Sequence, residues 1–203
     1  MDTIRTRFPD CTHIMVVDFE ATCGPGVSKT AAEIIEVGAI LYSFQDDLTN
    51  VEAPTFHRYI KPQIVSTLTR FCIRLTGITQ EQVNNGVSFT TMVLEWIEFL
   101  SENDCTASEV LFAAWTEFDI KQLRREVTRS NITLEFPHSI DLQKAYKTTQ
   151  KDGSIKSVAK ALAEQNLEFV GREHSAIDDA HNTARLLPFC NYGHSTSQNS
   201  KKK

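Results

Sequence analysis

The stretch His13-Ile-Met-Val-Val-Asp-Phe-Glu20 is a short apolar run that ends in two carboxylates placed two positions apart. Its β-branched residues, and the Pro9-Asp10 turn signal before it, predict a strand buried in a sheet. Side chains in a strand alternate between its two faces, so Asp18 and Glu20 point to the same face. Like charges there repel each other, and a hard divalent cation with oxygen ligands would offset this repulsion. A pair of acids merely solvated at the strand end is the alternative interpretation.

Three further segments favour strands. Residues 34–42 are a second buried run, and residues 55–60 are a third that ends at Lys61-Pro62. The turn-rich stretch 45–54 between them predicts an antiparallel hairpin. Residues 109–115 form a fourth apolar run, followed by a predicted helix from about 118 to 129.

Helical signals dominate the rest of the chain. Predicted helices are a short one over 66–75 stopped by Gly77, one opened by the Thr79/Gln82 capping box, one capped by Ser88, two over 142–147 and 157–167, and a last one from Ser175 to about residue 187, ended by Pro188. Strands first, and then strands alternating with helices, predict a mixed α/β sheet flanked by helices in a single domain. We place that domain at residues 1–190. Residues 191–203 are polar, end in three lysines and are expected to form a disordered tail.

Composition limits the class of protein. A chain of 203 residues with 41% hydrophobic residues can bury one core. Its apolar runs are far shorter than the roughly 20 residues of a membrane-spanning helix, and the N-terminus lacks a signal-peptide core. Five cysteines without a Cys-x-x-Cys pair argue against a disulfide framework or a zinc knuckle. We therefore expect no membrane association and an intracellular location, cytoplasmic or nuclear.

Two further segments bring acids into the first turn of a helix. Trp115-Thr-Glu-Phe-Asp119 crosses from strand to helix, and His174-Ser-Ala-Ile-Asp-Asp179 leads into the last helix. Taken singly, each acid is explained as helix capping or dipole compensation. Because Asp178 is accounted for by a capping box with Ser175, Asp179 is the better ligand candidate.

Taken in order, these segments resemble a known family. Val16-Val-Asp-Phe-Glu-Ala-Thr22, Trp115-x-x-Phe-Asp119 and His174-x-x-x-x-Asp179 resemble the three motifs of the DEDDh group of 3′→5′ exonucleases. Further segments resemble its Eri-type branch, the histone-mRNA and small-interfering-RNA exoribonucleases: Glu33-Ile-Ile-Glu-Val-Gly38, Ile60-Lys-Pro62 and Phe71-Cys-x-x-Leu-Thr-Gly-Ile-Thr-Gln80. The chain departs from that branch at Thr116-Glu117, where Gly-Asp or Gly-Asn is usual. The resemblance implies an RNase-H-like fold.

The resemblance also implies a two-metal site. Asp18 would bridge two divalent cations, Glu20 and Asp179 would hold the ion nearer the attacking water, and Asp119 would support the second. His174 would act as the general base that takes a proton from that water. Four carboxylates without a cysteine or histidine ligand suit Mg²⁺ or Mn²⁺. Two such ions would also offset the formal net charge of −5, which at first sight argues against a nucleic-acid partner.

The expected substrate is a polynucleotide 3′ end. The resemblance places the terminal nucleotide against Glu20 and Ala21, with Thr22 and His174 nearby and the turn from Leu75 to Ile78 on the base. Phe19 and Trp115 could stack on bases, but large apolar residues in strands are usually core, and we prefer core for both. The expected activity is a metal-dependent 3′→5′ exoribonuclease that releases nucleoside 5′-monophosphates from single-stranded ends or short 3′ overhangs, in RNA processing or RNA silencing. The alternatives are a 3′→5′ DNA exonuclease and a non-catalytic nucleic-acid-binding adaptor.

Overall fold

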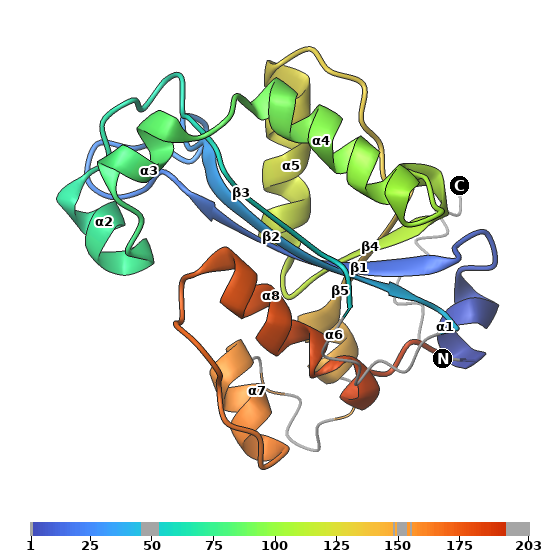
Figure 1. Cartoon of the computed structure of the whole chain (residues 1–203). Coiled ribbons are helices and arrows are strands. Elements are labelled where there is room, and N and C mark those ends of the chain that lie inside the picture. The colour runs from blue at the N-terminus through green and yellow to red at the C-terminus, as the bar shows by residue number, and fades with distance from the viewer. Residues whose placement is uncertain (1, 46–52, 148, 150–153, 155, 194–203) are drawn as a thin grey trace, which may run out of the picture.

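In the computed structural model, β1 (His13–Ala21) runs through the middle of a five-stranded sheet with the order β3-β2-β1-β4-β5 (Figure 1). β2 (Ile34–Ser43) is antiparallel to β1 and to β3 (Thr55–Tyr59), so the predicted hairpin is confirmed. β4 (Val110–Ala114) runs parallel to β1, and β5 (His138–Asp141) runs parallel to β4. The mixed sheet confirms the predicted fold class.

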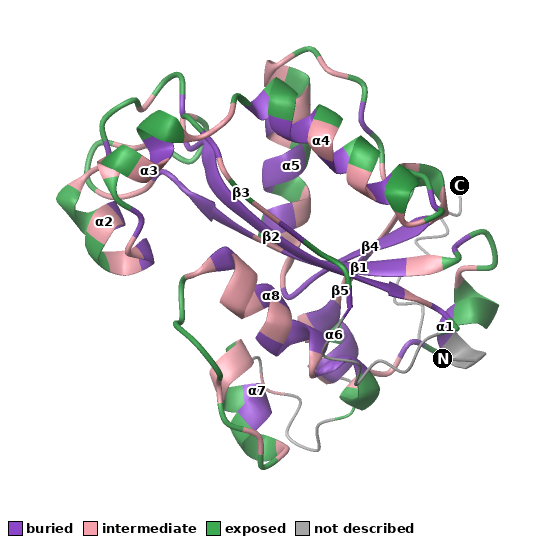
Figure 2. Cartoon of the chain, in the orientation of Figure 1, coloured by how far each residue is buried: buried purple, intermediate pink, exposed green. Residues whose placement is uncertain are grey.

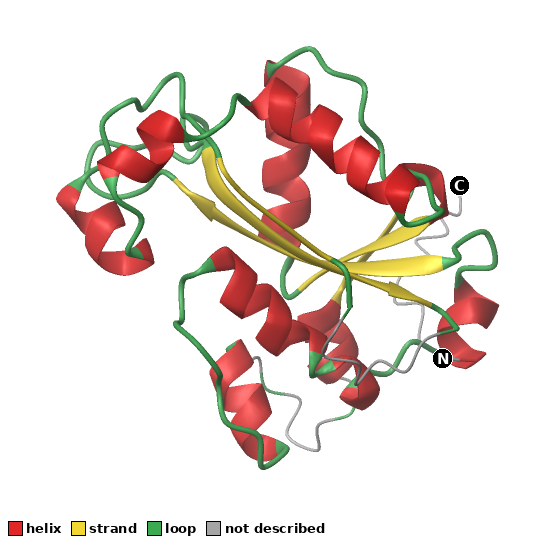
Figure 3. Ribbon diagram, in the orientation of Figure 1, coloured by secondary structure: helices red, strands yellow, loops and turns green. Residues whose placement is uncertain are grey.

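Helices cover both faces of the sheet, as Figure 3 shows. One face carries α4 (Phe89–Glu102) and α5 (Glu117–Arg129), and the other carries α6 (Leu142–Lys147), α7 (Val158–Glu164) and α8 (Ala176–Ala184). Three short helices complete the fold: α1 (Asp2–Arg7), α2 (Arg70–Thr76) and α3 (Gln80–Asn85). Two 3₁₀ turns occupy Ala107–Glu109 and Leu187–Phe189.

The structure describes residues 2–45, 53–147, 149, 154 and 156–193. Most of the predicted turn over 45–54 and residues 194–203 of the predicted tail lie outside these ranges. Within that predicted tail, Tyr192 is buried and packs into the core. In the described part of the chain, no helix combines the length and apolar character needed to cross a membrane.

Alternation along β1 builds two separate cores. Met15, Val17 and Phe19 face α4 and α5. There the Phe19 and Trp96 rings pack edge to face, with 6.1 Å between the ring centroids. Ile14 and Val16 face the side of α6, α7 and α8. Figure 2 shows the result, a buried sheet between helices whose outer surfaces are exposed. The sequence predicts that Asp18 and Glu20 share one face of the strand, and in the structure this is the face that α8 covers.

The structure corrects several predicted elements. Among the described residues, the sequence analysis did not predict β5, in which only Ile140 is buried, or α1, whose described side chains include one buried residue, Ile4. α2 begins at Arg70 behind the cap Thr69, later than predicted, and α7 ends at Glu164 before the predicted residue 167. The last helix ends at Ala184 rather than near residue 187. β5 and α1 bury so few residues that the sequence shows little apolar periodicity there, and this periodicity is the main signal for a strand or a helix.

The predicted capping box at the start of α8 is wrong. Ser175 makes no side-chain cap hydrogen bond. The backbone N–H of Ala176 instead donates to Glu36 Oε2 on β2, over 3.1 Å, and Asp178 Oδ2 accepts from the backbone N–H of Arg172 over 3.0 Å. An acid from β2 therefore accepts a hydrogen bond from one of the free N–H groups at the α8 N-terminus.

Gly38 lets α8 pack closely on β2. A Cβ atom at this position would lie 2.3 Å from the carbonyl carbon of Ala176 and from the backbone nitrogen of Ile177. Both are backbone atoms of the α8 N-terminus, so neither can turn aside. Gly38 is also the register partner of Asp18, which places this contact beside the first carboxylate.

Gly38→Ala is predicted to destabilise the protein, by about 1–3 kcal/mol in the free energy of unfolding, because the added methyl group overpacks the contact with α8. Urea denaturation measures this difference. Gly193→Ala is the control, because among the described residues a Cβ there would meet only the Asn191 side chain, at 3.3 Å. Equal stability of the Gly38→Ala variant and the wild type would show that α8 does not rest on β2 at this point.

Candidate active site

Asp18 and Glu20 lie near the carboxyl end of β1. They pair in register with Gly38 and Glu36 of β2, and the register shifts between Glu20 and Ala21. Glu20 pairs with Glu36 and Ala21 pairs with Ile34, so Ile35 of β2 is the extra residue in this pairing. The irregularity locally disrupts the ladder beside the second carboxylate.

Asp119 comes to β1 from α5. Thr116 caps this helix by accepting a hydrogen bond from the backbone N–H of Phe118, and Asp119 stands in the first turn. Asp119 Oδ1 accepts a hydrogen bond from the backbone N–H of Phe19 over 3.3 Å, and the residue is only 4% exposed. The second-motif acid is thus held against the backbone between Asp18 and Glu20.

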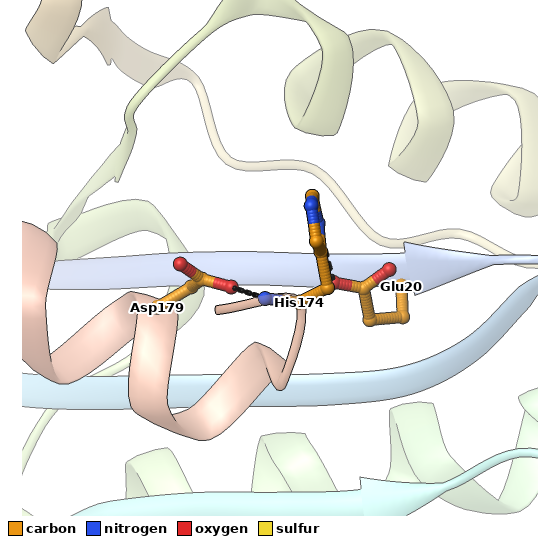
Figure 4. Close-up of side chains that lie close together, drawn as sticks. All are labelled: Glu20, His174 and Asp179. Atoms are coloured by element: carbon orange, nitrogen blue, oxygen red, sulfur yellow. Dashed lines mark hydrogen bonds and ion pairs between the residues drawn. The ribbon is translucent and has the colours of Figure 1, made fainter. Parts of the chain in front are cut away.

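Asp179 and His174 come from α8 and the loop before it. The backbone N–H of His174 donates to Asp179 Oδ2 over 2.7 Å, and His174 Nδ1 lies 4.0 Å from Glu20 Oε1. Figure 4 shows the three residues, with the imidazole ring standing beside the Glu20 carboxylate. One ligand atom from each of the three lies within 4.8 Å of the others. The His174 side chain is half exposed, and its φ of +64° is a conformation that residues other than glycine rarely adopt.

The carboxyl groups all have raised pKa values. Burial is the main cause for Asp18, and the charges of Asp119 and Asp179 raise its pKa further. Burial, with the charge of Asp179 next, raises the pKa of Glu20 to about 8, although Arg172 opposes this shift. Burial raises the pKa of Asp119 to about 7 and that of Asp179 to about 6, against the hydrogen bonds from Phe19 and His174 respectively.

This donor set fits a divalent cation. Carboxylates from β1, α5 and α8 converge, and burial, together with the repulsion between them, raises their pKa values. Hard ions such as Mg²⁺ prefer such oxygen ligands. The structure thus places the four acids predicted as ligands near one end of β1, with His174 beside them.

Glu36 is a residue of this region to which sequence reasoning gave no individual role. Its carboxylate is 2% exposed, with Oε1 2.7 Å from His57 Nε2 and Oε2 accepting from Ala176. These contacts make Glu36 an anchor for α8 rather than a free ligand. The signals in the sequence are a lone acid in the apolar run of β2 and its place in the Eri-type segment Glu33–Gly38.

The predicted substrate-binding residues flank the acids. Thr22 is buried, and its hydroxyl oxygen accepts a hydrogen bond from the backbone N–H of Glu33 over 3.0 Å. The Cys72 thiol of α2 donates to the carbonyl oxygen of Ala21 over 3.7 Å, which places α2 beside the end of β1. Leu75, at the end of α2, is partly exposed, whereas Ile78 is only 2% exposed.

Three other residues singled out in the sequence are also located. Phe19 and Trp115 are buried in the core, as preferred. Glu117, the extra acid of the second motif, forms ion pairs with Lys121 and Lys144. Its charge is therefore matched within the chain.

Comparisons with known proteins identify the family. Residues 15–187 match the family model described as exonuclease. The chain is 35% identical over 194 residues to mouse (Mus musculus) ERI1 exoribonuclease 2, covering 86% of this chain and 28% of that protein. It is 32% identical over 203 residues to the 3′-5′ exonuclease Snipper of Drosophila melanogaster, covering 90% and 70% respectively. The chain therefore belongs to the exonuclease family.

A solved structure gives the same result. The nuclease domain of 3′hExo, described as a DEDDh family member bound to rAMP, superposes with a TM-score of 0.77 at 28% identity, covering 87% of this chain and 90% of that one. The predicted resemblance to DEDDh exonucleases of the Eri type is confirmed. The chain spans less than a third of the length of its mouse relative ERI1 exoribonuclease 2.

Without divalent cations, the free energy of unfolding is predicted to fall as the pH rises from 5 to 8. The folded protein keeps protons on Glu20, Asp119 and Asp179 at pH values where the unfolded chain has released them, so deprotonation favours the unfolded chain. Chemical denaturation across this range, with a chelator present, measures the slope. The Asp18→Asn variant is the matched control and should show a shallower fall. A free energy that rises with pH in the chelated wild type would contradict the assignment.

Proposed function

We propose that this chain is a 3′→5′ exoribonuclease that hydrolyses RNA ends to nucleoside 5′-monophosphates with the help of two divalent cations. One observation carries the proposal: carboxylates from three separate elements meet at the end of β1, beside a half-exposed histidine. Such a group has no evident structural purpose, because burying like charges together destabilises the folded chain.

Each acid has a distinct place in this proposal. Asp18, on the central strand, would be shared by both ions, Glu20 and Asp179 would hold one of them, and Asp119 would support the other. When bound, Mg²⁺ or Mn²⁺ supplies positive charge that stabilises the phosphate oxygens during in-line displacement. The hydrogen bond from the His174 backbone fixes the orientation of the Asp179 carboxylate before any ion arrives.

His174 would be the general base. Its ring is half exposed and stands beside the Glu20 carboxylate, so it can reach a water molecule there and accept its proton. A ring nitrogen of the imidazole can accept a proton from such a water molecule, as this role requires. A positioned base of this kind contributes about 10²–10⁴ in rate.

The substrate contacts follow from the residues around the acids. The backbone at Glu20 and Ala21, with Thr22 behind it and His174 in front, would hold the terminal nucleotide, and the turn from Leu75 to Ile78 would contact its base. RNA is favoured over DNA by the Eri-type segments and by the relatives named exoribonucleases. DNA is the alternative substrate, since the relative Snipper is named simply an exonuclease.

A 3′-phosphate on a single-stranded RNA is predicted to stop digestion, because the proposed site accepts a free 3′ end. A 5′ block is not expected to stop it. Gel analysis of labelled oligonucleotides in Mg²⁺ measures this polarity, and matched DNA strands report the preference for RNA. Asp18→Asn is the inactive control. Digestion that only a 5′ block arrests would overturn the proposed direction.

His174→Ala is predicted to lower kcat by about 10²–10⁴ while the affinity for Mn²⁺ stays unchanged, because the imidazole handles a proton and does not hold an ion. Single-turnover kinetics and calorimetric titration of Mn²⁺ measure the two effects separately. His138→Ala, a half-buried histidine beside Phe8, is the control. A large loss of Mn²⁺ affinity would instead make His174 a ligand.

A further inference from the structure

The C-terminal end of α2 receives an unusual partner. The last carbonyl groups of a helix lack partners within it and need donors from elsewhere. Arg172, almost 100 positions away in sequence, supplies them: Nη1 donates to the Thr76 carbonyl oxygen over 2.5 Å, and Nη2 donates to that of Leu75 over 3.2 Å. A longer contact of 3.5 Å reaches the Arg74 carbonyl oxygen. The guanidinium group therefore closes the helix end that leads into the proposed base-contacting turn.

Glycine at position 77 makes room for this contact. Gly77 has a φ of +70°, and a Cβ there would lie 1.3 Å from Arg172 Nη1. Any larger residue would both strain the backbone and displace the guanidinium group. The turn and the arginine are thus built to fit each other.

The same arginine is also fixed at its backbone. Its N–H donates to Asp178 Oδ2 over 3.0 Å, and the preceding Gly171, with a φ of +87°, leaves no room for a Cβ beside the Asp178 carboxylate. His174 follows two positions later, held by its own N–H bond to Asp179. The loop from Gly171 to His174 is therefore attached to α8 at one side and to α2 at the other.

We propose that Arg172 is a positioning residue that connects the base-contacting turn Leu75–Ile78 to the loop bearing His174. Through this connection it fixes the position of the proposed nucleotide-binding residues relative to the general base. The inference builds on the proposed function and adds a residue that is neither a proposed ion ligand nor the proposed general base. A guanidinium group suits the task because its planar fork bonds adjacent carbonyls at once, whereas lysine offers only a point charge.

Arg172→Ala is predicted to lower kcat on single-stranded RNA by about ten- to a hundredfold, because a misplaced general base loses its alignment, and to raise KM through the loosened turn. Arg172→Lys should fall between this variant and the wild type. Arg74→Ala is the matched control: it removes a positive charge from the same end of α2 and leaves the backbone carbonyls in place. Mn²⁺ affinity, measured calorimetrically, should be equal in the wild type, Arg172→Lys and Arg74→Ala, because each of them keeps a positive charge at position 172.

Hydrogen exchange tests the connection between the turn 75–78 and the loop 171–174 without requiring nuclease activity. In the Arg172→Ala variant, amide exchange should accelerate both in residues 75–78 and in residues 171–175, while α4 exchanges as in the wild type. Faster exchange on one side alone, or an unchanged kcat, would overturn the coupling. A wild type that fails to digest RNA would refute the proposed function, yet the exchange experiment would still test this connection. If the alanine variant does not fold, the lysine variant gives both readouts.

Discussion

The packing of α8 across β1 and β2 is the contact on which the site depends. Asp18 and Glu20 are set by the alternation of one strand, but Asp179 reaches them only because Gly38 admits the α8 backbone and Glu36 satisfies the α8 N-terminus. Glu36 is in turn held by His57 from β3. Through this contact, β1, β2 and β3 together hold Asp179 and His174 in position.

Holding these carboxylates close together has an electrostatic cost. Burial and mutual repulsion raise the pKa values of the carboxyl groups, so the folded chain carries a destabilising cluster near one end of its sheet. Such clusters mark functional sites more often than structural ones. The stability of the surrounding sheet, with its two apolar cores on either face of β1, offsets this cost and holds the acids close enough to act together.

Much of the fold could be read from the sequence because its signals are local. The period of two in β1 and the caps Thr79 and Ser88 each depend on a few neighbouring residues, and the structure confirms them. The Ser175 capping box has the same local form, yet Ser175 makes no cap hydrogen bond and the Asp178 carboxylate accepts from the backbone N–H of Arg172. The first N–H group of the helix, that of Ala176, donates to Glu36, which lies 140 positions earlier in the chain. Partners so distant in sequence leave no pattern in either segment alone.

In the site, too, local sequence motifs predict some residues, whereas others are found only from the folded structure. The order of the three acidic motifs identifies the family and the candidate ligands, whereas the roles of Glu36 and Arg172 appear only once β2, α2 and the loop before α8 are brought together. Both residues act on backbone groups, and the sequence carries no mark of which backbone a side chain will bond. Positioning of this kind is visible only in three dimensions.

We propose that carboxylates from β1, α5 and α8 hold a pair of cations between them. Anomalous diffraction from crystals grown with Mn²⁺ and a nucleoside 5′-monophosphate locates such ions. Two Mn²⁺ peaks are expected, both in contact with Asp18, one also bound by Glu20 and Asp179 and the other supported by Asp119. Absence of Mn²⁺ from this cluster, with ions bound elsewhere on the chain, would contradict the proposal.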